Sequence, residues 1–531
     1  MKYLVTASEM KQYDANTIEK TGIPGMVLME RAALAALDVI KEYFKINEKT
    51  DKNPRRVLIA AGMGNNGGDG LALARLLCEE GFSVEVWGIG SPDKASGQRR
   101  LQREILAHYP VLYKDKAEPV TAIPMQDKGY DVIVDALFGV GLSRELTGEY
   151  AETVHYCNEQ RAFKLAVDVP SGICSDTGKM LGAWAFQADV TITFGFAKRG
   201  LFQYPGCTLA GRVITAPIGI TERSFYGQMP GMFIYDEPLA ELLPPRNPAG
   251  NKGTFGKVLL IAGSLNMAGA AVLSARAAYR MGAGMVKVLT VPENRVIIQE
   301  KVPEALVGTY EDLEEGLRWA DVAGIGPGLS KSPEAHEVLR KIICDSRLPL
   351  LLDGDALNLL AVDEALKQKL AVQGEIDKRK NTEEKNSCWS LDGRDRGRQI
   401  ILTPHVGELS RLTGKSISEL KEDLVSHACL LAKKLHAVIA AKDARTYVCQ
   451  EEKPVCMNIR GGSGMATAGS GDVLAGCILG LMAQGADAFK AASVGVYAHA
   501  IAGEQAAREY GEYGCMAGDI AEMLGKDIIN P

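Results

Sequence analysis

Short apolar runs alternate with segments of helical period along most of this chain. Between the apolar runs at 57–61 and 83–88, residues 71–80 repeat their apolar side chains with the period of a helix. This alternation predicts βαβ units around a mainly parallel sheet, because parallel strands are joined through a crossover that is usually a helix. A helix-rich segment over Thr6–Phe44 comes first, and the strands predicted after it are Val57–Ala61, Ser83–Gly88, Val132–Leu137, Lys164–Val169 and Val190–Phe194.

A second alternating series begins after a stretch near 221–256 that is rich in proline, glycine and asparagine. A chain of 531 residues is too long for a single core, so this change of composition predicts a domain boundary. We expect one domain over residues 1–221, a linker over 222–245 and a second domain over 246–531. The strands predicted in the second domain are Lys257–Ala262, Met285–Thr290, Val322–Ile325, Leu348–Leu352 and Ala437–Ala441.

Residues 373–399 differ in composition from the rest of the second domain. They include 13 charged residues among 27 and few large apolar ones. Such a segment buries too little apolar surface to join a core. We expect a surface insertion or a mobile loop there, and a partner-binding role is an open alternative.

The overall charge and the cysteines exclude several classes of protein. A net charge of −6 argues against a general nucleic-acid binder and against docking to an anionic membrane. No run of about 18 apolar residues is present, and the first residues lack the apolar core of a signal peptide. The 11 cysteines form no C-x-x-C pair and the seven histidines form no metal-binding pattern. We expect a cytoplasmic protein with reduced thiols and without nucleic-acid or membrane partners.

The stretch Gly469-Ser470-Gly471-Asp472 places one carboxylate after three small residues, at the start of an apolar helical run. Backbone N–H groups at a helix N-terminus attract phosphate oxygens, and glycine lets a ligand approach the backbone closely. Phosphate would repel the Asp472 carboxylate unless that group served a purpose, such as accepting a proton from a hydroxyl that is being phosphorylated. A capped helix start explains the same residues, and both interpretations stay open at this point.

In the first half, polar side chains follow three predicted strands. A turn over Ala61–Gly70 mixes glycines with two asparagines and an aspartate, Asp135 ends another strand, and Asp168–Ser171 follows a third. Open α/β sheets bind ligands beyond the carboxyl ends of their strands, so we expect these groups to converge on one crevice. Hard oxygen ligands without His or Cys suit an alkali or alkaline-earth cation. A plain tight turn and ordinary helix caps are the alternatives.

Turns with small residues accompany the strands of the second half as well. Asn251-Lys252-Gly253 precedes a strand, small residues over Met267–Ala271 start a helix, and Gly326–Leu329 follows a further strand. His405 stands between a strand and a helix, beside a proline and a glycine. A lone histidine is more often structural than functional, but a position at a strand end favours a role in a site.

Four motifs of the first half occur in order and together resemble the NAD(P)H-hydrate epimerase family. They are Thr6-x-x-Glu9-Met10 with Gly22-Ile23-Pro24-Gly25, then GMGNNGGDG, DALFGVGLSRELTGEY and AVDVPSGICSDTG, and they span about residues 1–220. The resemblance implies a Rossmann-like three-layer αβα domain that interconverts the R and S forms of hydrated NAD(P)H and binds K⁺. It also implies Asp168 as the acid/base residue.

The same resemblance implies the ligand contacts of this domain. The implied K⁺ ligands are Asn66, Asp135 and Ser171. The implied contacts to the hydrate are Asp168 and two short segments, Asn65, Asn66, Gly67, Gly68 and Asp69, and Gly139, Val140, Gly141, Leu142, Ser143, Arg144 and Glu145.

The motifs of the second half resemble the ADP/ATP-dependent NAD(P)H-hydrate dehydratase family over about residues 230–531, the charged insertion excepted. The resemblance implies a ribokinase-like αβα domain in which ADP or ATP, with Mg²⁺, phosphorylates the hydrated nicotinamide. Asp472 is then the base that deprotonates the ring hydroxyl, and elimination of the phosphorylated hydroxyl restores the nicotinamide. The implied contacts to the hydrate are Ala270, Gly328, His405 and Asp472, and those to the nucleotide are Lys442, Asp443, Ala444, Arg445, Thr446 and Gly471.

The chain departs from this second family at two positions. It has Lys442-Asp443 where the family usually has Lys-Gly, and Asn251 where the family often has His. Asp443 therefore places a Cβ atom and a negative charge near the implied nucleotide site.

Together the two resemblances predict a bifunctional enzyme of metabolite repair, in which one domain supplies the epimer that the other dehydrates. Homo-oligomers are expected by analogy with the family. A ribokinase-like small-molecule kinase fused to a ligand-binding Rossmann-like module is the alternative enzyme. A first half that serves only as a sensing or scaffolding module is a further alternative.

Overall fold

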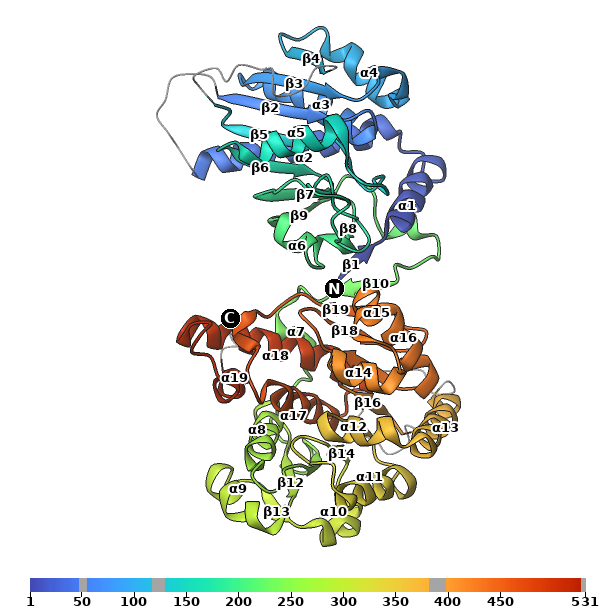
Figure 1. Ribbon diagram of the computed structural model, residues 1–531, viewed down its shortest axis with the longest axis vertical. Coiled ribbons are helices and arrows are strands. Elements are labelled where there is room, and N and C mark those ends of the chain that lie inside the picture. Colours follow the sequence, from blue (N-terminus) through green and yellow to red (C-terminus); the bar gives the residue numbers. More distant parts are fainter. Residues whose placement is uncertain (47–54, 117–128, 382–397, 527–531) are drawn as a thin grey trace. The chain divides into compact units, whose positions relative to one another are not determined.

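The computed structural model describes residues 1–46, 55–116, 129–381 and 398–526, and the chain divides into two compact units (Figure 1). The N-terminal unit comprises Tyr3–Met232, and the C-terminal unit comprises Met1–Lys2 and the chain from Phe233 onward. Each unit has three layers, with helices covering both faces of a largely parallel sheet (Figure 1).

The N-terminal unit is built on a seven-stranded sheet in the order β4-β3-β2-β5-β6-β7-β9, and all six pairings are parallel. Two further strands, β1 and β8, pair in parallel with Val5 opposite Lys198. The strands are β1 (Lys2–Val5), β2 (Arg56–Ala61), β3 (Ser83–Ile89), β4 (Leu112–Lys116), β5 (Val132–Ala136), β6 (Phe163–Val167), β7 (Val190–Phe194), β8 (Ala197–Lys198) and β9 (Arg212–Ala216). The helices are α1 (Ala7–Glu19), α2 (Gly25–Ile46), α3 (Asn65–Glu79), α4 (Gly97–Leu106), α5 (Gly148–Glu159) and α6 (Gly206–Leu209).

Alternate residues of the central strands enter opposite layers of this unit. In β2, Val57 and Ile59 belong to the core that contains residues of α1, α2 and α3. Leu58 and Ala60 belong to a separate core on the other face, together with residues of α5. Burial on both faces explains why the strands read as near-continuous apolar runs in the sequence.

The C-terminal unit contains strands in the order β13-β12-β11-β14-β15-β16-β17-β18-β19. The pairings from β13 to β17 are parallel, whereas β18 and β19 are added antiparallel. The strands are β10 (Met232–Ile234), β11 (Lys257–Ile261), β12 (Met285–Leu289), β13 (Leu306–Gly308), β14 (Val322–Ile325), β15 (Leu350–Leu352), β16 (Ile400–Leu402), β17 (Val438–Ala441), β18 (Thr446–Cys449) and β19 (Val455–Asn458).

Helix α17 lies at the centre of this unit and packs against α8, α18 and β14. Its residues from Val473 to Met482 are all buried, as expected of a helix that is apolar on every side. A Cβ atom on Gly476 would lie 2.2 Å from the carbonyl oxygen of Ser274 in α8, so glycine lets these two helices approach closely. The helices of the unit are α7 (Leu239–Leu242), α8 (Ala268–Arg280), α9 (Arg295–Lys301), α10 (Leu313–Trp319), α11 (Pro333–Asp345), α12 (Gly354–Val362), α13 (Glu364–Asn381), α14 (Val406–Thr413), α15 (Ile417–Glu422), α16 (Leu424–Leu435), α17 (Ser470–Ala483), α18 (Ala488–Tyr510) and α19 (Ala517–Met523).

The α/β class predicted from the sequence is confirmed. All ten strands predicted by range are present, and their ends differ from the prediction by at most two residues. The expected linker is not a bare connection, because β10 and α7 fall within residues 222–245 and the Tyr235 ring packs against Tyr497. The expected insertion begins as regular structure, since α13 extends to Asn381, and residues 382–397 of it lie outside the described residues.

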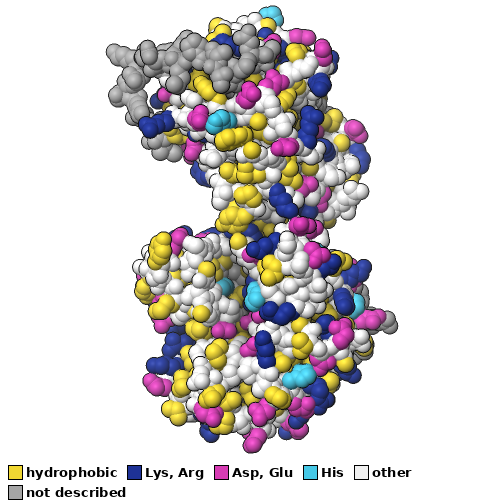
Figure 2. Space-filling view, in the orientation of Figure 1, with side chains coloured by type: hydrophobic (Ala, Val, Ile, Leu, Met, Phe, Trp, Pro, Cys, Tyr) yellow, Lys and Arg dark blue, Asp and Glu magenta, His cyan; other side chains and the backbone are white. Residues whose placement is uncertain are grey.

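Charged side chains of both signs are interspersed over the face in Figure 2, in keeping with the small net charge of −6. No helix within the described ranges is long and apolar enough to span a membrane. Ten cysteines lie in the described part of the chain, and all ten are free thiols.

Two candidate active sites

Asp168 directly follows β6 in the N-terminal unit and has a left-handed backbone, with φ of 69°. A non-glycine residue rarely adopts this conformation unless its surroundings hold it there. Its side chain is nearly buried, and Oδ1 accepts hydrogen bonds from Lys198 Nζ at 2.5 Å and from Thr193 Oγ1 at 3.2 Å. Oδ2 accepts one bond, from the backbone N–H of Val140 at 3.2 Å. One oxygen is thus held by a cation, while the other keeps capacity for a further partner.

Asp135 is the last residue but one of β5, and its carboxylate is buried against Ser171. The Ser171 hydroxyl donates to Asp135 Oδ1 and the Ser171 backbone N–H donates to Oδ2, both at 2.7 Å. Burial raises the pKa of Asp135 to about 6, although the hydrogen bonds from Ser171 and Leu137 oppose this rise. The strand-end loops at 135 and 171 therefore meet, as the sequence predicts.

Asn66 and Asp69 lie in the first turns of α3, which begins at Asn65 directly after the glycine-rich turn. Both polar atoms of the Asn66 side chain are buried without a hydrogen-bond partner. Most buried amides in proteins are satisfied, so this amide is a candidate to bind a ligand that the protein itself does not supply. Burial and the carboxylates of Asp168 and Asp14 raise the pKa of Asp69 well above its usual range. Asp69 therefore lies within electrostatic range of Asp168.

The segment 139–145 lies beside Asp168 and opens onto a cavity of about 390 Å³. A Cβ atom on Gly139 would lie only 2.6 Å from Asp168 Oδ2, so the carboxylate rests on bare backbone there. Leu142 is buried in the core and anchors the segment, whereas Ser143, Arg144 and Glu145 are exposed. Rings of Phe138 and Tyr150 line the same cavity together with Leu142, Arg144 and Glu145.

In the C-terminal unit, Asp472 stands in the first turn of α17, where Ser274 of α8 donates a hydrogen bond to its backbone oxygen. Burial and the Asp353 carboxylate raise the pKa of Asp472 to about 7, while the Lys442 cation opposes them. A carboxyl group with a pKa near neutrality exchanges protons readily at physiological pH. The helix-cap alternative receives no support, because no side-chain cap bond is present at the start of α17.

A buried ion pair lies next to this helix start. Asp353 follows β15 and accepts hydrogen bonds on Oδ1 from Lys442 Nζ at 2.8 Å and from Thr403 Oγ1 at 2.6 Å. A Cβ atom on Gly471 would lie 3.4 Å from Lys442 Nζ. The Lys442 ammonium therefore points at the α17 N-terminus, where both favour an anion.

His405 serves as the N-cap of α14. Its Nδ1 accepts backbone N–H bonds from Gly407 at 2.9 Å and from Glu408 at 3.3 Å, and burial and the Lys442 cation lower the His405 pKa. His405 therefore has a structural role as the cap of this helix. The side chain is nevertheless 55% exposed, so the outer face of the ring remains accessible to a ligand.

Ala270 and Gly328 lie close together, as expected of two residues that are both assigned to the hydrate. Gly328 has φ of 58°, and a Cβ atom on it would lie 2.8 Å from the Cβ of Ala270. Of the residues assigned to the nucleotide, Lys442 and Gly471 are brought together, whereas Asp443 and Ala444 are exposed. Arg445 donates to the carbonyl oxygen of Ile459 at 2.9 Å, and Thr446 begins β18.

Two family models match this chain, one in each of its halves. A family model described as YjeF-related protein N-terminus matches residues 25–200, and one described as NAD(P)H-hydrate dehydratase matches residues 258–373 and 382–526. The chain is 35% identical to the bifunctional NAD(P)H-hydrate repair enzyme Nnr of Moorella thermoacetica, over 98% of this chain and 96% of that protein. The chain belongs to the family of bifunctional NAD(P)H-hydrate repair enzymes. The Coxiella burnetii enzyme of the same name is 34% identical, over the full length of both chains.

One solved structure is similar to about half of this repair-family chain. It is the ADP/ATP-dependent NAD(P)H-hydrate dehydratase from Bacillus subtilis, co-crystallised with ATP and Mg²⁺. The identity is 26% and the TM-score 0.44, over 54% of this chain and 93% of that one.

Two charged residues beside the candidate sites were not predicted from the sequence. Asp353 follows the predicted strand at 348–352 directly, so the rule that singled out Asp135 and Asp168 would also have found it. Lys198 gave a weaker signal, since it is a single lysine after an apolar stretch. Its partner, Asp168, is 30 residues away in the sequence.

Proposed function

We propose that the chain repairs hydrated NAD(P)H in two steps, with epimerisation in the N-terminal unit and nucleotide-dependent dehydration in the C-terminal unit. The family supports the overall activity. The assignment of the two sites rests on two carboxyl groups, Asp168 and Asp472. Each lies beside other residues that the family motifs assign to the same site. Asp472 lies at the start of α17, near the Lys442 ammonium, and Asp168 keeps one carboxylate oxygen, Oδ2, with capacity for a further partner.

Asp168 is the acid/base residue of epimerisation in this proposal. Its Oδ1 is held by Lys198 and Thr193, so Oδ2 is the atom that exchanges a proton with the hydrated ring. The hydrate lies between the segments 65–69 and 139–145, and the cavity beside the second segment accommodates part of it. Both epimers must bind the same pocket, and an open cavity is compatible with that requirement.

The potassium ion of this unit is assigned to Asn66, Asp135 and Ser171. These residues fit such an ion, because the Asn66 amide is buried without a partner and the other two present oxygens at the ends of neighbouring strands. An ion bound there supplies a fixed positive charge at the edge of the substrate site. The donors are hard oxygens only, which suits an alkali cation.

Asp472 is the base of the dehydration step in this proposal. It accepts the proton of the ring hydroxyl while that oxygen takes the terminal phosphoryl group of the nucleotide. Phosphate then leaves with the electrons of the carbon–oxygen bond, and loss of a proton from the adjacent ring carbon restores the double bond. Ala270, Gly328 and His405 are the remaining contacts to the hydrate.

The nucleotide, ADP or ATP, is assigned to Lys442–Thr446 and to the backbone of Gly471, with Mg²⁺ neutralising its phosphates. The ammonium of Lys442 near Gly471 supports a phosphate position at the α17 N-terminus. Asp443 is exposed, which is compatible with nucleotide binding despite its negative charge.

The domain limits follow from the same reasoning. We infer an epimerase domain over 1–221 and a dehydratase domain over 246–531, with 222–245 between them. The lack of membrane-spanning helices in the described residues is compatible with a cytoplasmic enzyme. Homo-oligomers are proposed by analogy with the family.

Asp168→Ala provides the test of the epimerase assignment. Purified R hydrate is incubated with the full chain, K⁺, Mg²⁺ and nucleotide, and NAD(P)H is followed by its absorbance. The wild type is expected to recover NAD(P)H from the R epimer, and the variant only from the S epimer. Unimpaired recovery from the R epimer by Asp168→Ala would show that the assignment is wrong. A phosphorylated product retained from the S epimer would instead favour the small-molecule kinase.

A further inference from the structure

Lys198 is among the most deeply buried charged side chains of the N-terminal unit, with 1% of its surface exposed. Its ammonium donates to Asp168 Oδ1 at 2.5 Å, to Thr193 Oγ1 at 2.9 Å and to the carbonyl oxygen of Phe194 at 3.1 Å. An ammonium has three N–H donors, and all three are used. Lys198 therefore has no donor left for a substrate, and its charge acts on Asp168.

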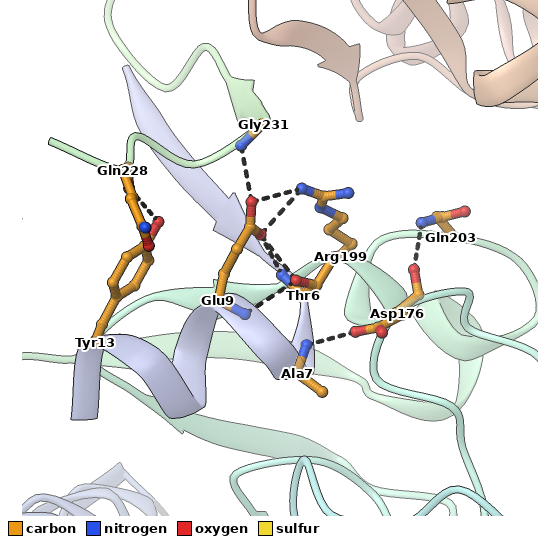
Figure 3. A network of polar contacts seen from close by, with 9 residues as sticks. All are labelled: Thr6, Ala7, Glu9, Tyr13, Asp176, Arg199, Gln203, Gln228 and Gly231. Atoms are coloured by element: carbon orange, nitrogen blue, oxygen red, sulfur yellow. Dashed lines mark hydrogen bonds and ion pairs between the residues drawn. The ribbon is translucent and has the colours of Figure 1, made fainter. Parts of the chain in front are cut away.

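The strand that carries Lys198 is held in place by the first residues of the chain. Val5 of β1 pairs with Lys198, and the next residue, Arg199, donates to both carboxylate oxygens of Glu9 at 3.0 and 3.2 Å. Figure 3 shows Glu9 between Arg199, Gly231 and Thr6. The Glu9 carboxylate also accepts hydrogen bonds from the backbone N–H groups of Thr6 and Gly231. The motif Thr6-x-x-Glu9 thus ties α1 to the segment that contains Lys198.

We propose that Lys198 is a positioning residue for epimerisation, which holds the Asp168 carboxyl group in a single orientation, and that the Glu9–Arg199 pair fixes the strand from which Lys198 acts. The inference rests on the proposed role of Asp168. With Oδ1 held by Lys198 and the backbone in its left-handed conformation, Oδ2 is fixed above the bare backbone of Gly139. A preoriented base needs no reorganisation when the substrate binds.

The hydrogen bonds of Asp168 show why this cation matters. Asp69 of α3 and Asp14 of α1 lie near enough to Lys198 for its charge to oppose the rise of both of their pKa values. Without Lys198, Asp168 Oδ1 would keep only the hydrogen bond from Thr193 at 3.2 Å. A single bond to that oxygen fixes the orientation of the carboxylate less well than two.

The test compares Lys198→Met and Lys198→Arg in the full chain, with Lys41→Met as a control that removes an exposed lysine paired with Glu80. The kcat and KM of R-to-S interconversion are measured, and dehydration of pure S hydrate by the same preparation serves as the internal reference. Displacement of a reacting group by about 1 Å can cost about 100-fold in rate. We therefore expect Lys198→Met to lower the kcat of epimerisation by about ten-fold to 100-fold and to leave its KM within about two-fold of the wild type.

Lys198→Arg, which keeps a cation and hydrogen-bond donors at this position, should restore at least part of the lost rate. An unchanged rate in Lys198→Met, or a KM that rises as much as kcat falls, would overturn the inference. If Lys198→Met lowers the thermal stability of the N-terminal unit, Lys198→Arg decides, because a folded Lys198→Arg variant with no recovered rate contradicts a role through the contact with Asp168. Failure of the wild type itself to interconvert the epimers would refute the proposed function instead.

Discussion

Replacing Asp472 by asparagine removes the proposed base of dehydration while keeping the shape of the side chain. Asp472 stands in the first turn of the buried helix α17, with the Asp353–Lys442 pair beside it. A positioned general base contributes about 10² to 10⁴ in rate. We expect Asp472→Asn to lower the rate of S-hydrate dehydration within that range and to leave epimerisation unchanged.

The pH dependence of the wild type follows from the same site. Burial and the Asp353 carboxylate raise the pKa of Asp472 to about 7. The base is active when ionised, so the fraction of active enzyme rises from about one tenth at pH 6 to about nine tenths at pH 8. The rate of dehydration should increase roughly ten-fold over this interval, and the asparagine variant should lack this increase.

Stability gives an independent check on this variant. Because the folded state raises the pKa of Asp472, the wild type loses stability as the pH increases from about 4 to 7, on the order of a few kcal/mol. Asp472→Asn should therefore unfold at a higher temperature than the wild type at pH 8, and the difference should disappear at pH 4.

The assay follows NAD(P)H absorbance from pure S hydrate with Mg²⁺ and saturating ADP or ATP, alongside thermal unfolding of both proteins. An asparagine variant that retains more than about one tenth of the wild-type rate, below the general-base range, would refute the role of Asp472 as base. A variant that is less stable than the wild type at pH 8 would contradict the buried, destabilising carboxylate on which the pH argument rests.

Three further predictions concern other parts of the two sites. Gly139→Ala places a Cβ atom 2.6 Å from Asp168 Oδ2 and should lower the rate of epimerisation about 100-fold by displacing the base. The rate of dehydration is the control, and a decrease in epimerisation of less than about two-fold would contradict the placement of the base. Exchange of K⁺ for Na⁺ should lower the rate of epimerisation, and return of K⁺ should restore it. The epimerisation rate of Asn66→Ala should respond only weakly to K⁺. Equal wild-type rates in both salts would exclude the assigned ion. Asp443→Gly should change the KM for nucleotide by less than about two-fold, since exposed charges contribute little, and a ten-fold lower KM would mean that Asp443 faces the nucleotide.

The α/β class and most central strands could be predicted from the sequence because burial on both faces leaves continuous apolar runs. The short strand β8 gave no such signal, since two residues are too few to form a pattern. The same holds for β10 and α7, which lie in the expected linker and acquire their structure by packing on the C-terminal unit, as the contact of Tyr235 with Tyr497 illustrates. Local sequence does not encode such tertiary contacts.

The candidate sites were predictable where a side chain follows a strand directly. Asp135 and Ser171 were expected to meet at one edge of the sheet, and they do. Lys198 could not be found in this way, because its significance depends on its contact with Asp168, which only the folded chain creates. The environment of His405 was also beyond the sequence, since its use as a helix cap depends on side-chain orientation.

Recovery of NAD(P)H from an equal mixture of the two hydrate epimers tests the central claim most directly. The purified full chain is supplied with K⁺, Mg²⁺ and either ADP or ATP, and absorbance is followed to its end point. Epimerisation coupled to dehydration predicts complete recovery. An end point at about half, which is the share of the S epimer alone, would contradict the epimerase function, and no recovery with either nucleotide would contradict both.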